Sequence, residues 1–134
     1  MPPEQNVMFQ HFYYSSGPIA MLAIAGNVGN AVVNIAADAD FQANYMTITV
    51  VQAGLVVLNW SGTIVINDSA VGRTFGNIAG AVDGFRGNGQ LPYPFNPPRM
   101  FKSNTSVTIT TVNSVAAVAT TVEVIFHGNK IIPM

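Results

Sequence analysis

The alternation of apolar and polar residues is the feature that most constrains the fold of this chain. It is clearest between Phe41 and Val51, in the run Tyr45-Met46-Thr47-Ile48-Thr49-Val50. A period of two among β-branched residues predicts a half-buried β-strand. The segments 107–112 and 118–127 repeat the pattern, and Glu123 falls on the face opposite its apolar neighbours.

Turn-forming residues divide the remaining chain into further short strands. Strands are expected at Met8–Tyr14 and Val32–Ile35, and the segment 19–25 favours a loop or a short strand over a helix. Segments 55–60 and 63–66 predict either two paired strands or one strand with a bulge at Gly62. Gly128 is expected to end the last strand, and Pro133 to keep the tail out of the sheet.

Together these segments predict an all-β fold with six to eight strands and no helix longer than one or two turns. The spacing favours an antiparallel β-sandwich, jelly-roll-like, with long connecting loops. One core suffices for 134 residues. We divide the chain into an N-terminal arm with an aromatic edge strand, residues 1–14, and a single sandwich domain, residues 15–134.

Charge is scarce, because only 8% of residues are Asp, Glu, Lys or Arg while 49% are hydrophobic. An exterior made from such a chain is either covered with neutral polar side chains or buried against other subunits. The net charge of -1 offers no basic patch for nucleic acid or for an anionic membrane. The longest apolar run, Ile19–Ala25, is too short to span a bilayer, and the N-terminus lacks the features of a signal peptide.

The ionisable residues show no catalytic or metal-binding pattern, so we expect no enzyme, no cofactor and no metal. The two histidines, His11 and His127, lie within expected strands and lack a second ligand at metal-site spacing. Asp38 and Asp40 could share a calcium ion, but no closing Glu follows, which favours a simple capped strand start. The glycine-rich segment 84–89 is followed by Leu-Pro instead of a helix, which argues against phosphate binding. The chain has no cysteine.

Aromatic and arginine side chains dominate protein contacts, and they gather in two parts of this chain. One is the aromatic strand near the N-terminus, and the other is the proline-rich segment 91–101 with its neighbourhood. The alternative for the second is a proline-fixed crossover packed on its own sandwich. The residues expected to contact a partner are Phe9, Phe12, Tyr13, Tyr14, Arg86, Tyr93, Phe95 and Arg99.

Residues 65–73, 87–92 and 124–131 resemble small proteins that decorate or cement the capsid of tailed bacteriophages. The matching runs are Val65-Ile66-Asn67-Asp68-Ser69 with Gly72-Arg73, Gly87-Asn88-Gly89-Gln90-Leu91-Pro92, and Val124-Ile125-Phe126-His127-Gly128-Asn129-Lys130-Ile131. The resemblance implies a jelly-roll-like sandwich that forms a homo-oligomer, a dimer or a trimer, on the major capsid protein. It also implies assembly in the host cytoplasm and a final place on the capsid surface of the virion.

A second interpretation is a carbohydrate-binding or host-receptor-binding jelly roll of a phage tail fibre or baseplate. Such a site would use Trp60, Tyr13, Tyr14 or Tyr93 as stacking platforms. The flanking residues favour a core position for Trp60.

Overall fold

Every regular element in the computed structural model is a β-strand, within the described residues 6–24, 26–56, 60, 62–69, 73–74, 80–81, 93–113 and 118–133. None of these described segments forms a helix able to cross a membrane. The strands are β1 (Val7–Ser15), β2 (Ile19–Met21), β3 (Asn27–Asn34), β4 (Asp40–Gln52), β5 (Leu55–Val56), β6 (Thr63–Asp68), β7 (Arg73–Thr74), β8 (Gly80–Ala81), β9 (Tyr93–Phe101), β10 (Ser106–Asn113) and β11 (Thr120–Pro133).

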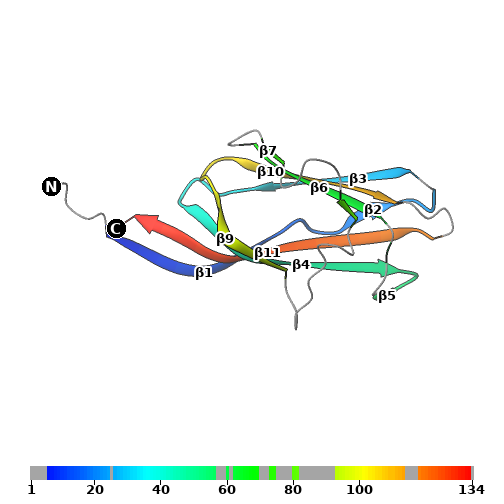
Figure 1. Cartoon of the computed structure of the whole chain (residues 1–134), viewed down its shortest axis with the longest axis horizontal. Coiled ribbons are helices and arrows are strands. Elements are labelled where there is room, and N and C mark those ends of the chain that lie inside the picture. Colours follow the sequence, from blue (N-terminus) through cyan, green and yellow to red (C-terminus); the bar gives the residue numbers. More distant parts are fainter. Residues whose placement is uncertain are drawn as a thin grey trace.

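The strands form two antiparallel sheets stacked as a sandwich (Figure 1). The first sheet has the order β1-β11-β4-β5, with β2 also beside β11 and β9 also beside β4. The second has the order β3-β10-β6-β7, with β8 also beside β6. The chain crosses between the sheets from β2 to β3, from β3 to β4, from β5 to β6, and at each step from β8 to β11, which is the connectivity of a jelly roll. The prediction of an all-β, antiparallel, jelly-roll-like sandwich is confirmed.

The described residues contain more strand segments than the six to eight expected, because strands at the sheet edges are broken into pieces. β1 and β2 both pair with β11, and the turn at Gly17, whose φ is +68°, separates them. β7 and β8 likewise pair with opposite ends of β6. β1 with β2, and β7 with β8, therefore each occupy the place of a single strand at the edge of their sheet.

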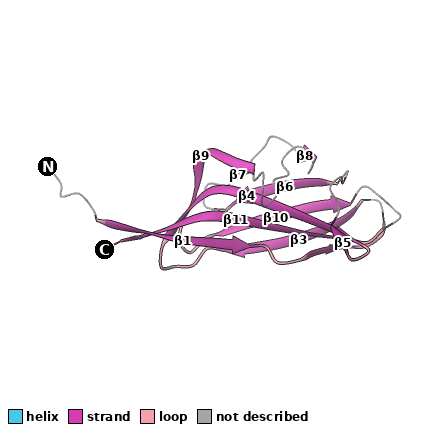
Figure 2. Ribbon diagram, turned by 90° about the horizontal axis from the view of Figure 1, so that it is seen from below, coloured by secondary structure: helices cyan, strands magenta, loops and turns pink. Residues whose placement is uncertain are grey.

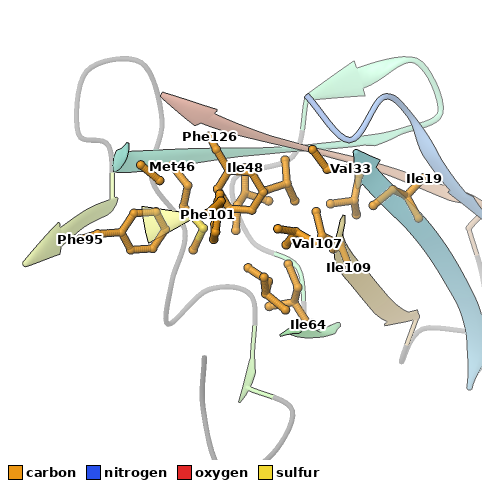
Figure 3. Packing of buried hydrophobic residues seen from close by; sticks show 14 of the residues in the cluster. Ile19, Val33, Met46, Ile48, Ile64, Phe95, Phe101, Val107, Ile109 and Phe126 are labelled. Carbon is orange, nitrogen blue, oxygen red and sulfur yellow. The ribbon is translucent and has the colours of Figure 1, made fainter. Parts of the chain in front are cut away.

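Alternation along the central strands places one face of each sheet in a shared core. In β10, and in β11 as far as Gly128, every second residue is buried, as the period-two pattern predicts. Phe41, Phe101 and Phe126 are fully buried, and the Phe101 ring contacts the rings of both others. Figure 3 shows Phe101 and Phe126 within the core cluster. Trp60 is 2% exposed and donates from Nε1 to Asn113 at 3.4 Å, so the core position predicted for it is confirmed.

The C-terminal strand continues past Gly128 and includes Pro133, the two residues that were expected to stop it or to keep the tail out of the sheet. β11 runs to Pro133, which lies opposite Val7 of β1 at the edge of the sheet. Gly128 does not end the strand; it lies at the β-bulge, where an added Cβ would collide with the carbonyl of Gln42. The glycine is therefore required by a close backbone approach, and the prediction of a strand end there is wrong.

The proline-rich segment forms an edge strand along β4 instead of a loop. β9 pairs with β4 at both of its ends and bulges between Pro94 and Arg99, around a cis Asn96–Pro97 peptide bond. Proline is tolerated here because an edge strand needs only one row of backbone hydrogen bonds.

Candidate protein-binding surfaces

β1 and the C-terminal part of β11 form a two-stranded apolar ribbon, whose end extends beyond the other strands (Figures 1 and 2). β1 is paired along its whole length with β11, from Val7 opposite Pro133 to Ser15 opposite Ile125. Near the N-terminal end Val7 is 38% exposed, Met8 48% and Phe9 59%. These neighbours point alternately to the two faces of the ribbon, so both of its faces present apolar side chains to solvent.

Two of the predicted contact residues of β1 are packed against the core. Phe12 and Tyr14 are half-buried on the inner face, where Tyr14 meets Phe41 edge-on with ring centroids 4.9 Å apart. The Tyr14 hydroxyl accepts a hydrogen bond of 3.1 Å from the backbone N–H of Ala36. Lys130 lies 4.2 Å above the Phe12 ring, with only 11% of its side chain exposed. These two aromatic residues therefore attach β1 to the sandwich.

The other two, Phe9 and Tyr13, lie on the outer face, and each is 59% exposed. Tyr13 begins a row of rings that crosses three strands. His127 of β11 lies opposite Tyr13 and opposite Tyr45 of β4, and it stacks on Tyr45 with centroids 4.6 Å apart. Burial, and to a smaller extent the charge of His11, lower the pKa of His127 below its usual value.

The predicted contact residues near β9 have separate environments. Phe95 is 8% exposed and belongs to the core, where Tyr93 packs edge-on against it. Arg99 is exposed and lies opposite Ala43 on β4. Arg86 lies outside the described residues. The structure thus brings Tyr93 and Phe95 together inside the sandwich and leaves Arg99 at its edge.

The outer face of the second sheet carries no ionisable side chain on β3, β10 or β6. Its residues are Val, Asn, Ser and Thr: Val28, Asn30, Val32, Asn34, Thr63, Val65, Asn67, Ser106, Thr108, Thr110 and Val112. We call this set the neutral face. Val28 is 50% exposed and Val32 56%. Polar side chains on this face hydrogen-bond to their neighbours; for example, the Thr110 hydroxyl donates to the Asn30 amide oxygen at 2.9 Å.

The valines of the neutral face were not among the predicted contact residues. The sequence did contain a signal, because Val28 and Val32 alternate with Asn30 and Asn34 and so share one strand face. However, small residues on both faces of this segment hide which face is buried. Which face of β3 is buried is decided only by the pairing of β3 with β10.

A third apolar surface lies at the end of the sandwich away from the β1–β11 ribbon. Leu22 and Ile24 precede β3 with exposures of 62% and 56%, and Leu55 and Val56 form β5 with exposures of 73% and 64%. Figures 1 and 2 both place β5 at this far end. Both ends of the long molecule therefore expose apolar side chains.

Two aspartates and two lysines of the described residues tie loops to strands. Asp38 accepts from Lys130 at 3.1 Å, and Asp40 accepts from the backbone N–H of Ser103 at 2.8 Å and lies 3.7 Å from Lys102. Within the described residues, no three His, Asp or Glu side chains gather at a spacing that would hold a metal ion. The two aspartates thus have lysine and backbone partners.

Compared with models of known protein families and with curated protein sequences, the chain has no match. The candidate surfaces are therefore interpreted from their own chemistry.

Proposed function

We propose that the protein is a structural subunit of a virion that decorates or cements a phage capsid, by binding across neighbouring capsid subunits. The observation that carries the proposal is the neutral face: a broad strand surface without charge, with exposed valines among Thr and Asn. Desolvating such a face costs no buried charge. Its contact with a second protein surface gains from the apolar area that both lose to water.

A subunit with such a face is suited to binding a symmetric shell built from many identical protein subunits. A standard interface buries about 800 Å² on each partner. A face of neutral side chains gives each copy modest affinity, and copies that are linked to one another gain from multivalency on a symmetric shell. The resemblance of segments 65–73 and 124–131 to capsid decoration proteins points to the same role.

The test is co-sedimentation of the purified protein with shells of the phage that encodes it, both intact and emptied of DNA. We expect binding to both, because the proposed contact is on the capsid exterior. A lysine introduced by Val32→Lys lies on the neutral face, midway along its edge strand β3, and burying its unpaired charge should weaken binding by about 2 kcal/mol or more. Stability should change little, because the position is exposed.

The matched control is Thr49→Lys, an exposed position on the outer face of the first sheet. It adds the same charge and should leave shell binding unchanged. Wild-type protein that fails to sediment with either shell, or equal weakening by the two substitutions, would contradict the proposal.

One observation favours the alternative of a carbohydrate-binding module. Tyr13 is exposed beside the stacked pair of His127 and Tyr45, and an exposed ring is what a sugar face packs against. Trp60 is excluded from this role by its burial. Glycan-array binding that disappears in Tyr13→Ala, together with the absence of shell binding, would support this alternative.

A further inference from the structure

Within the part of the chain that the structure describes, β1 is an edge strand, paired only on the side of β11. No described residue pairs with β1 on the side away from β11. Natural edge strands are usually protected by charges, prolines or bulges. The strand Val-Met-Phe-Gln-His-Phe-Tyr-Tyr-Ser has none of these, and its register with β11 is unbroken.

One hydrogen bond shows which backbone groups face this open edge. The N–H of Ser16 donates to the carbonyl of Val124 on β11 at 2.8 Å, directly after the last register pair of β1. In an antiparallel strand, backbone groups turn to one neighbour and then to the other at alternate residues. The even-numbered residues of β1 therefore bond to β11, and the odd-numbered residues from Val7 to Ser15 aim their N–H and C=O groups at the open edge.

We infer that a second copy of this chain occupies the open edge, with the two β1 strands antiparallel about a two-fold axis at His11, so that the two first sheets become one. His11 is the midpoint of Val7–Ser15 and an odd-numbered residue. All edge-facing backbone groups therefore meet partners: Phe9 lies opposite Tyr13 of the second copy, and Val7 opposite Ser15.

The side chains of β1 are also placed in a way that is compatible with this two-fold axis. Phe9 and Tyr13 have equal exposure and share the outer face, four residues apart, so the two-fold axis places each against the other. Aromatic cross-strand pairs are among the more stabilising contacts in sheets. On the inner face, Met8 meets Tyr14 of the second copy. β1 carries no Asp, Glu, Lys or Arg, so no fixed like charges oppose one another.

A two-fold pairing of this kind closes on itself. The same strand is used by both copies, so the interface is isologous and stops at a dimer. The inference goes beyond the proposed function, because it concerns the free protein. It is tested with the purified protein alone, without capsid shells. A negative result for one of the two proposals therefore does not contradict the other.

The register is tested by charge exchange, with sedimentation velocity at micromolar concentration as the measurement. Wild-type protein should be a dimer. The double variant Phe9→Lys with Tyr13→Lys places like charges opposite each other twice and should weaken the dimer by about tenfold or more. The double variant Phe9→Lys with Tyr13→Glu places opposite charges at the same sites and should restore the dimer.

The backbone contribution is tested at the axis itself. The variant His11→Pro removes an N–H that faces the open edge without removing a bond to β11, and it should sediment as a monomer. His11→Ala keeps the N–H and should remain a dimer, and thermal unfolding of the two variants at concentrations below dimerisation should agree. A monomeric wild type, or a dimer in which the lysine–lysine and lysine–glutamate variants behave alike, would overturn the inference.

Discussion

At the scale of single residues, His127 combines an aromatic environment with a titratable ring. Its ring stacks on Tyr45, is tilted against Tyr13, and has Nε2 3.1 Å from Oγ1 of Thr47. These neighbours remove water from the imidazole, and that burial, followed by the charge of His11, lowers the pKa of His127 in the folded chain. Protonation is therefore less favourable in the folded state than in the unfolded one.

The sign of the resulting pH dependence follows from linkage. An unfolded histidine has a pKa of about 6.5, so the stability provided by neutral His127 is complete above that pH and is lost as the pH falls towards the lower folded-state pKa. We expect the urea midpoint of unfolding to fall between pH 7.5 and 5.5, and His127→Gln to reduce that fall. His11→Gln is the control, since it removes only the charge of His11, which is the smaller of the two causes that lower the pKa of His127. An unchanged pH response in His127→Gln would contradict this assignment.

At the scale of elements, β1 has two parts with different roles. Val7 and Met8 lie opposite Pro133 and Ile132, beyond the part of β11 that pairs with β4, whereas Phe12 and Tyr14 pack on the core and on Lys130. Deleting residues 1–10 should therefore leave thermal unfolding of the monomer nearly unchanged. Deleting residues 1–14 removes two half-buried rings and should lower stability by more than about 2 kcal/mol. Calorimetry that gives equal losses for the two truncations would contradict this division.

At the scale of the whole molecule, the scarcity of charge affects every contact that the protein makes. Only 8% of residues are charged, and the neutral face and β1 contain no Asp, Glu, Lys or Arg. Association through these surfaces depends on apolar area and backbone hydrogen bonds, neither of which is screened by salt.

We therefore expect the affinity of self-association and of shell binding to change less than about threefold between 0.05 and 0.5 M NaCl. Ammonium sulfate should strengthen both, because it favours burial of apolar surface. Sedimentation across the salt series provides the measurement. A steep loss of binding with NaCl would indicate an interface formed by the few charged residues, such as Arg99, instead.

The sequence by itself determined the fold class and most strand positions, because period-two alternation is a local property that reports directly which face of a strand is buried. Phe41–Val51 and Val107–Val112 show this most clearly. It also indicated the buried position of Trp60 and the lack of charge on the exterior.

The tertiary structure decided what depends on the neighbour of each strand. Gly128 is a bulge residue because β4 passes close to it, and Phe95 is a core residue because β9 lies along β4. Phe9 and Phe12 are both phenylalanines of one strand, but only pairing with β11 and packing on Lys130 separate an exposed ring from an attached one. The open edge of β1 is likewise a property of strand order, because a strand's own sequence does not state how many of its sides are paired.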